Sequence, residues 1–283
     1  MVSKKLIKRQ PFKDKIAIVC GGSKGMGKAT AREIVKLGGS VAIVARGLDA
    51  LNKAAEELKA QKVEESQFIE IISCDTTDMN KLKPLFEEFI EKNRVPDYLI
   101  NCVGYAYSQY IQKLTLEDFK KNMNVNYYGQ LIPILILLPY FIERKEGYIA
   151  NISSMMGFFG IVGYATYAPS KFAIVGLTEV LRHELKPYNI KFSILYPPDT
   201  DTPGFEEEEK TKPEEAKIIS EGGGLLTPEE VAEEFIEGIL NERFEILPKR
   251  AKFIWRMFRH FPKLVRNIID KDYEKARKKV KGN

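Results

Sequence analysis

Cysteine and histidine are scarce in this 283-residue sequence, which contains three cysteines and two histidines. Cys20, Cys74 and Cys102 stand far apart along the chain, and each closes an apolar run. Such cysteines are typical of buried, reduced thiols at strand ends in a cytoplasmic protein rather than of disulfides. With so few candidate ligands, we expect neither a structural nor a catalytic metal site.

Long apolar runs are also missing. The longest run, Leu131–Tyr140, contains two prolines and is about half as long as a membrane-spanning helix needs to be. The basic residues between Lys4 and Arg9 are not followed by the apolar segment of a signal peptide. We therefore expect neither a spanning helix nor a cleaved signal.

Charge is unevenly distributed behind the formal net charge of +5. Residues 1–15 carry a net charge of +5, residues 249–283 carry +10, and residues 16–248 carry −10. Nucleic-acid-binding proteins place positive charge on the folded body, so nucleic acid is not an expected partner. Basic chain ends on an acidic body are typical instead of segments that contact an anionic surface.

Short, almost continuously apolar runs alternate with longer segments of helical periodicity. The runs predict buried strands at Lys15–Cys20, Ser40–Ala45, Phe68–Cys74, Asp97–Cys102, Gly147–Ser153 and Ile190–Tyr196, with a short strand near Phe244–Leu247. The other segments predict helices at Gly25–Leu37, Leu48–Gln61, Met79–Asn93, Leu116–Glu143 (in two parts), Ala165–Lys186 and Pro228–Leu240. This alternation predicts an α/β fold, a Rossmann-type doubly wound parallel sheet of about seven strands with helices on both faces.

Two regions lie outside the alternating pattern. Residues 197–226 are rich in Pro, Gly and Glu without apolar periodicity, which predicts a long functional loop. Residues 249–283 form a basic amphipathic segment. We therefore divide the chain into a basic N-terminal extension (1–14), a catalytic Rossmann domain (15–248) that contains the loop, and a basic C-terminal extension (249–283).

A glycine-rich turn follows the first predicted strand and opens the first predicted helix. Glycine permits a tight turn and close approach to a pyrophosphate, which the N–H groups at a helix start can bind. The candidate dinucleotide-binding residues of the turn are Gly21, Ser23, Lys24, Gly25, Met26 and Gly27. A plain turn is the alternative, but the position between a strand and a helix favours dinucleotide binding.

The end of the second predicted strand indicates which dinucleotide binds. An Asp or Glu there usually binds the free 2′-hydroxyl of the adenosine ribose, but this strand ends in Ala45-Arg46-Gly47. Arg46 and Lys24 would instead neutralise a 2′-phosphate, which favours NADPH/NADP+; as the alternative, both are solvated surface bases. Asp75, after the third strand, is placed either to bind the adenine amino group or to cap the next helix.

Tyr167 and Lys171 are four residues apart and therefore share one face of a predicted helix. Ser154 lies at the carboxyl end of the fifth strand, the edge where such sheets bind ligands. The pKa of a phenol lies near 10, and we expect the Lys171 ammonium and an oxidised nicotinamide to lower it. Tyr167 is then the general acid of a carbonyl reduction, with Ser154 donating to the alkoxide and Lys171 holding the nicotinamide ribose.

Together with Asn101, Gly104 and Asn126, these motifs resemble the short-chain dehydrogenase/reductase family over about residues 15–200. The resemblance implies that Asn101 and Gly104 stabilise the turn beside the adenosine. It also implies that Asn126 distorts its helix and holds a water that links Lys171 to solvent, as a fourth catalytic residue. Taken alone, Asn126 would be interpreted as a polar residue on a helix surface.

The family resemblance further implies a homodimer or homotetramer assembled through the helices at 116–143 and 165–186. Two departures from the family pattern stand out. Cys20 occupies a position where threonine is usual, and Pro169 lies between Tyr167 and Lys171. The proline is tolerable only if the helix begins within a turn of it.

The stretch Tyr196–Phe205, with Lys210–Pro213 and Ile218–Glu221, is similar to the 3-ketodihydrosphingosine (3-dehydrosphinganine) reductases. This resemblance implies a long-chain lipid ketone as substrate, reduced at its 3-keto group to sphinganine with NADPH. It places Pro197, Thr200 and Thr202 at the cofactor. Of the acidic run at 206–209, one carboxylate at most pairs with the substrate ammonium. The alternatives are another lipophilic ketone (steroid, retinoid or 3-oxoacyl group) or a non-catalytic NADP-binding scaffold.

The C-terminal segment has two chemically different sides on a helical wheel. The basic stripe consists of Lys252, Arg256, Arg259, Lys263 and Arg266; opposite it lie Ile254, Met257, Phe258, Phe261, Val265 and Ile268, with Trp255 near the boundary. Such a helix can lie in a membrane interface, or it can pack on the domain or in a dimer. Pro262 is expected to bend or split it. The resemblance to the sphingoid reductases implies the cytosolic face of the endoplasmic reticulum as the membrane, and without a spanning segment the attachment there would be peripheral.

Overall fold

A seven-stranded parallel sheet forms the centre of the computed structural model, which describes residues 9–221 and 224–282. The strands are β1 (Ile16–Cys20), β2 (Ser40–Ala45), β3 (Ile69–Ser73), β4 (Tyr98–Asn101), β5 (Gly147–Ile152), β6 (Ile190–Leu195) and β7 (Glu245–Ile246). Their order is β3-β2-β1-β4-β5-β6-β7, so the direction of the chain along the sheet reverses between β1 and β4. This reversal opens a crevice at the carboxyl ends of these strands, where doubly wound sheets bind ligands.

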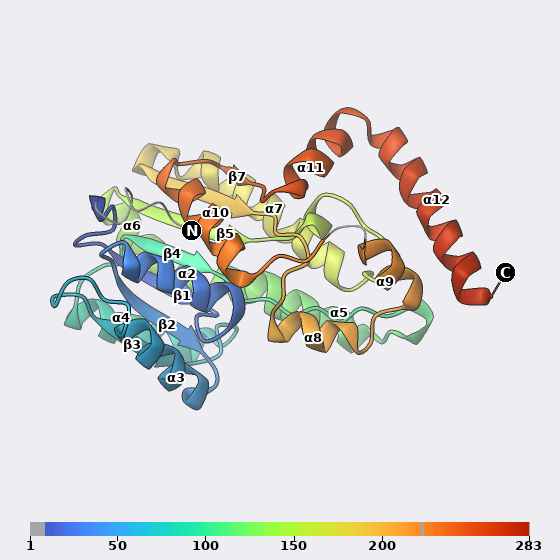
Figure 1. Ribbon diagram of the computed structural model, residues 1–283. Helices are drawn as coiled ribbons and strands as arrows, with labels where there is room; N and C mark the ends of the chain where they lie inside the picture. The colour runs from blue at the N-terminus through green and yellow to red at the C-terminus, as the bar shows by residue number, and fades with distance from the viewer. Residues whose placement is uncertain (1–8, 222–223, 283) are drawn as a thin grey trace.

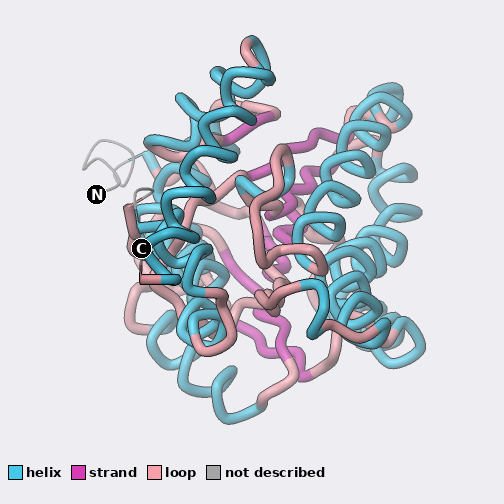
Figure 2. Tube along the Cα trace, turned by 90° about the vertical axis from the view of Figure 1, so that its right-hand side faces the viewer, coloured by secondary structure: helices cyan, strands magenta, loops and turns pink. Residues whose placement is uncertain are grey.

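Helices cover both faces of the sheet, as the alternating pattern predicts (Figures 1 and 2). One face is covered by α2 (Gly25–Lys36), α3 (Leu48–Lys59) and α10 (Pro228–Leu240), and the other by α4 (Met79–Lys92), α6 (Gly129–Arg144) and α7 (Tyr167–Glu184). The strands are buried almost throughout, which explains why they are apolar at nearly every position. The predicted fold is confirmed.

The segment Leu116–Arg144 is the most apolar helical stretch of the described chain. It comprises α5 (Leu116–Met123), the π-helical turn η2 (Asn124–Tyr128) and α6, and it is long and apolar enough to cross a membrane by length and composition alone. That result differs from the sequence expectation. However, Ile134, Leu137 and Phe141 are fully buried in the core beneath the sheet. The apolar composition of α6 therefore reflects a core helix of this fold.

The predicted loop at 197–226 is wrong in part, because it contains two helices, α8 (Pro203–Glu209) and α9 (Glu214–Glu221). The Thr202 hydroxyl accepts the N–H of Phe205 at 3.1 Å, and Pro203 occupies the first helical position. Both are helix-start signals that the sequence already carried. The two residues 222–223 of this region lie outside the described residues.

The C-terminal segment forms two helices, α11 (Arg250–His260) and α12 (Pro262–Lys281), split at Pro262 as predicted. In Figure 1, α12 runs along the edge of the molecule beside α9. At the other end, Phe12 is 1% exposed and its ring packs edge-on against Tyr98, with centroids 5.1 Å apart. The folded body therefore begins before residue 15, and residues 1–8 of the predicted basic extension lie outside the described residues.

The three cysteines are free and lie at strand ends. Cys20 is the last residue of β1, and Cys74 and Cys102 directly follow β3 and β4. Burial raises the pKa of the Cys20 thiol and raises that of Cys102 to about 12, so both stay protonated at neutral pH. Cys102 is only partly buried, and it borders the cavity described below.

Candidate active site

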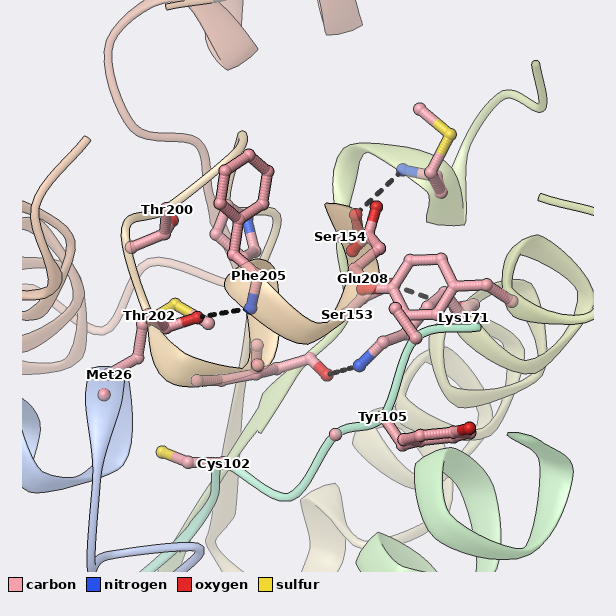
Figure 3. Close-up of a pocket in the computed structure, with 18 of the residues that line it drawn as sticks. Met26, Cys102, Tyr105, Ser153, Ser154, Lys171, Thr200, Thr202, Phe205 and Glu208 are labelled. Carbon is pink, nitrogen blue, oxygen red and sulfur yellow. Dashed lines mark hydrogen bonds between the residues drawn. The ribbon is translucent and has the colours of Figure 1, made fainter. Parts of the chain in front are cut away.

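A cavity of about 1090 Å³ lies at the carboxyl ends of β1, β4 and β5 and extends under α8, α11 and α12 (Figure 3). Its walls combine segments that are far apart in sequence: the glycine-rich turn, the ends of β2 and β5, the start of α7, and the C-terminal helices. All of the site residues predicted from the sequence line this cavity except Asn101 and Asn126.

The glycine-rich turn is so tightly packed that side chains do not fit at two positions. A Cβ on Gly27 would lie 2.2 Å from the carbonyl oxygen of Gly21, and Gly21 itself has a φ of +79°. The turn thus lets the start of α2 sit directly against the end of β1. Within the described part of the chain, the N-cap residue Lys24 makes no side-chain capping hydrogen bond. The first residues of α2, Gly25 to Gly27, line the cavity without a side-chain cap, an arrangement suited to phosphate binding.

Arg46 and Asp75 line the part of the cavity next to the ends of β2 and β3. The Arg46 guanidinium lies 3.9 Å from the Asp75 carboxylate, and the Arg46 side chain is 79% exposed. Asp75 accepts hydrogen bonds from the backbone N–H of Thr77 at 2.9 Å and from its hydroxyl at 2.8 Å. Helix α4 is capped by Asp78, so the alternative that Asp75 caps this helix is wrong. Asp75 remains a cavity residue.

Ser154 and Tyr167 meet at the centre of the cavity. Helix α7 begins at Tyr167, so Pro169 falls in its first turn, where its missing N–H costs no hydrogen bond. The Ser154 hydroxyl accepts the N–H of Met156 at 3.1 Å, which leaves its own proton to donate. A hydrogen bond with Ser154 favours the ionised form of Tyr167.

Lys171 lies one helical turn after Tyr167 and is 2% exposed. Its Nζ donates to the carbonyl oxygen of Ile152 at 3.2 Å and lies 5.5 Å from the centroid of the Tyr167 ring. Gly104 lies beside this nitrogen, since a Cβ on it would be in van der Waals contact with Nζ at 3.6 Å. Burial lowers the pKa of Lys171 to about 8.

The expected lowering of the Tyr167 pKa is not found. Burial raises the pKa of this phenol above its usual value, and the charges of Glu208 and Asp199 raise it further. The hydrogen bond with Ser154 opposes these effects without overcoming them. Tyr167 is therefore a fully protonated phenol at neutral pH, the state that a proton donor must start from.

Asn126 and Asn101 occupy positions behind the cavity wall. Asn126 lies in the η2 turn, so the expected distortion of its helix is present. Its amide oxygen accepts the N–H of Tyr105 at 2.7 Å, and its amide nitrogen donates to Ser170 at 2.8 Å. Asn101 is fully buried, donates to Asn151 at 2.9 Å and does not line the cavity, so it cannot contact a cofactor directly and can only support the adjacent turn. Both residues position the elements that carry the site.

Sequence reasoning missed the polar wall opposite Lys171. Tyr164 donates a hydrogen bond to the Glu208 carboxylate, and both residues line the cavity. Lys212, whose side chain is fully buried, lies 3.6 Å from Glu208. Of the acidic run, Glu206 and Glu207 are exposed while Glu208 turns inward. Lys212 lies in the link between α8 and α9, beyond the last residue of α8, so its approach to Glu208 depends on the path of this link.

Comparisons with known proteins place the chain among reductases. The short chain dehydrogenase family matches residues 15–213. A 3-ketodihydrosphingosine reductase from Dictyostelium discoideum is 41% identical over 249 residues, covering 83% of this chain and 75% of that protein. A 3-dehydrosphinganine reductase from Danio rerio is 40% identical over 228 residues, covering 80% and 69%. The crystal structure of a 3-oxoacyl-acyl-carrier-protein reductase from Brucella melitensis with bound NAD has a TM-score of 0.69 at 25% identity, covering 82% and 86%.

Proposed function

The chain belongs to the short chain dehydrogenase family, and we propose that it reduces 3-ketodihydrosphingosine to sphinganine with NADPH. One observation carries the proposal. Ser154, Tyr167 and Lys171 converge in a cavity that continues between α8 and the C-terminal helices, where its wall is apolar. The apolar wall consists of Phe205, Ile219, Phe253, Ile254, Met257, Val265, Ile268 and Ile269. Such a wall suits a long alkyl chain attached to a ketone.

The residues present fit a nicotinamide dinucleotide phosphate. The uncapped start of α2 and the close-packed Gly21 and Gly27 suit a pyrophosphate. Arg46 and Lys24 line the cavity near the ends of β1 and β2, and the residues directly after β2, Arg46 and Gly47, include no carboxylate that would repel a 2′-phosphate. This combination favours NADPH over NADH.

The chemistry follows from the protonation states of the site. A reduced nicotinamide bound there supplies the hydride. The Tyr167 hydroxyl gives its proton to the ketone oxygen, and Ser154 donates a hydrogen bond that stabilises the developing alkoxide. With a pKa of about 8, Lys171 is largely protonated at neutral pH and compensates the charge left on the Tyr167 oxygen. The ketone thus gains a hydride and a proton and becomes an alcohol.

The test is an assay of NADPH consumption by the purified protein with 3-ketodihydrosphingosine. Turnover is expected with the wild type, and Tyr167→Phe should reduce kcat at least about 100-fold because it removes the transferred proton. Tyr188→Phe, the same change at a 37% exposed tyrosine just after α7, is the control. Rapid reduction of steroid, retinoid or 3-oxoacyl ketones without turnover of the sphingoid ketone would reject the proposed substrate. Cellular function that survives Tyr167→Phe would favour a non-catalytic scaffold.

We further propose that α11 and α12 attach the protein peripherally to an anionic membrane, on the cytosolic face of the endoplasmic reticulum. Phe253 and Ile268 line the cavity and are also 67% and 46% exposed, so the cavity opens to the outside between these helices. Phe261 and Leu264 are 56% and 49% exposed beside basic residues of the segment, which carries a net charge of +10. The mouth of the cavity would then face the bilayer that contains the lipid.

Membrane attachment can be measured by flotation with anionic and with neutral vesicles. The wild type should float with anionic vesicles only. Lys263→Glu combined with Leu264→Ser should weaken binding at least about 10-fold, because each basic residue near the surface contributes about 1 kcal/mol. Lys83→Glu on α4 is the matched control. Equal flotation of all three proteins would contradict attachment through α12.

We also propose a homodimer or homotetramer formed through α5, α6 and α7. Large apolar side chains on these helices are exposed, among them Leu135 (44%), Phe172 (46%) and Val180 (52%). Residues 15–248 would form the catalytic domain of each subunit, with residues 249–283 as its membrane-facing part. Light scattering after gel filtration should give a multiple of the 32.3 kDa chain mass, and a monomer at micromolar concentration would refute the assembly.

A further inference from the structure

We infer that Glu208 and Asp199 form a subsite for a substrate ammonium group, so that the cavity selects ketones with an amine on the neighbouring carbon. The inference rests on the proposed function. The amine of 3-ketodihydrosphingosine stands one carbon from the ketone that Tyr167 protonates. Any group that recognises this amine must therefore lie close to Tyr167 and Ser154.

Glu208 occupies that place. It lines the cavity together with Ser154 and Tyr167, and it lies at the same end of the cavity as Ser154 (Figure 3). Its charge acts on the Tyr167 phenol, which shows that the two groups are within electrostatic reach. Tyr164 donates to the Glu208 carboxylate and holds it in position. Helix α8, which starts at the Thr202 cap, carries Glu208 over the site.

Among the described residues around Glu208, negative charges outnumber positive ones. Asp199, Glu208 and Glu209 surround a single buried cation, Lys212. The Lys212 nitrogen lies 2.6 Å from Glu209 but 3.6 Å from Glu208 and 3.9 Å from Asp199. Lys212 is therefore within hydrogen-bond distance of Glu209 alone, and Glu208 and Asp199 receive only its longer-range attraction.

Asp199 and Glu208 are partly buried and share one cation, Lys212, with Glu209, so the three carboxylates are only partly compensated. Burial raises the pKa of both Asp199 and Glu208, and neighbouring carboxylates raise it further. An ammonium that enters the cavity beside them would restore neutrality and gain charge-assisted hydrogen bonds. A neutral ketone of the same length gains neither. Asp199 and Glu208 thus provide a physical basis for selecting an amino ketone over a neutral ketone.

The aromatic rings beside Glu208 suit the same ligand. The centroids of Tyr164 and Tyr167 are 5.9 Å apart, and both residues line the cavity. Faces of tyrosine rings attract cations, and Lys212 already lies 5.8 Å from the Tyr164 centroid on one side. A second cation on the cavity side would find the same attraction.

The experiment compares two substrates of equal chain length, 3-ketodihydrosphingosine and the analogue that lacks the 2-amino group. The measured quantity is the ratio of their kcat/KM values for NADPH consumption. Glu208→Gln retains an acceptor for Tyr164 and removes only the charge. The ratio should favour the amino ketone in the wild type and fall about 10- to 100-fold in Glu208→Gln, the range for a hydrogen bond to a charged group. Glu207→Gln, exposed on the same helix, should keep the wild-type ratio.

The outcomes separate this inference from the proposed function. An unchanged ratio in Glu208→Gln, or a wild type that does not prefer the amino ketone, overturns the ammonium subsite while leaving the reductase intact. A wild type that reduces only unrelated ketones overturns the proposed function instead. If Glu208→Gln does not fold, Asp199→Asn carries the same expectation. In these variants the affinity for sphinganine, measured by calorimetry, should decrease. The affinity for the deaminated analogue should stay the same.

Discussion

Replacing Lys212 by methionine should loosen the segment that covers the active site. The side chain of Lys212 is 0% exposed and faces three carboxylates, at 2.6 Å (Glu209), 3.6 Å (Glu208) and 3.9 Å (Asp199). Methionine keeps the unbranched shape of the buried stem but removes the charge. Three like charges would then share one partly buried volume without a cation, which is strongly unfavourable.

The exposed fractions of the three carboxylate side chains set a limit on the loss in the free energy of unfolding. Removing one partner of a buried ion pair costs about 3–5 kcal/mol. The Glu208 side chain is only 12% exposed, but those of Glu209 and Asp199 are 33% and 34% exposed and can turn toward water. We therefore expect a loss of about 2 kcal/mol in the free energy of unfolding, concentrated in α8 and α9. Thermal unfolding measures the global effect, and limited proteolysis locates it between residues 203 and 221.

The pH dependence has a definite sign. The pKa values of Asp199 and Glu208 are already raised in the folded wild type, and loss of Lys212 raises them further above their unfolded values. The folded variant then binds protons more tightly than the unfolded chain, so its deficit relative to the wild type shrinks as the pH falls from about 7 toward 5.

Lys210→Met is the matched control, because Lys210 is 64% exposed and pairs only with the exposed Glu207. It should change stability by less than about 0.5 kcal/mol. Equal stability of the two variants at neutral pH, or a Lys212→Met deficit that does not shrink on acidification, would refute the charge argument.

Three further predictions concern the cofactor side of the cavity. Arg46→Ala should raise the KM for NADPH about 10- to 100-fold and leave the KM for NADH nearly unchanged in steady-state assays, since a charged contact to the 2′-phosphate is lost. Gly27→Ala should abolish dinucleotide binding, measured by fluorescence titration, because its Cβ would lie 2.2 Å from the Gly21 carbonyl oxygen. The kcat/KM of reduction should fall as the pH rises through about 8, where Lys171 loses its proton. Over the same rise, denaturant unfolding should show increasing stability, because the unfolded chain binds that proton more tightly.

The sheet was predictable from sequence because its strands are buried on both faces. Strands such as β2 (Ser40–Ala45) are continuously apolar and end at turn residues, so their existence and nearly their bounds follow from composition. The proximity of Tyr167 and Lys171 was predictable because they lie one helical turn apart. For the strands and for this pair, the pattern of residues close together in the sequence was sufficient for the prediction.

Features that depend on tertiary contacts were not predictable. Helices α8 and α9 are only 7 and 8 residues long, too short for a helical apolar pattern to stand out in the sequence, and charges such as Lys212 hold them in place. The raised pKa of Tyr167 arises mainly from burial of the phenol and further from the charges of Glu208 and Asp199, which no sequence spacing connects to it. Asn101 faces a buried neighbour, Asn151, on an adjacent strand, so its role depended on strand order.

The cavity joins the two ends of the chain, and this has a consequence for biosynthesis. Residues 21–27 form one wall, and residues 253–269 close the opposite wall. During translation the dinucleotide half can therefore fold while the ribosome still holds the segment that shapes the apolar half. A nascent chain at that stage would have no enclosed chamber for an alkyl tail, so capture of a hydrophobic ligand must await the emergence of the last helices.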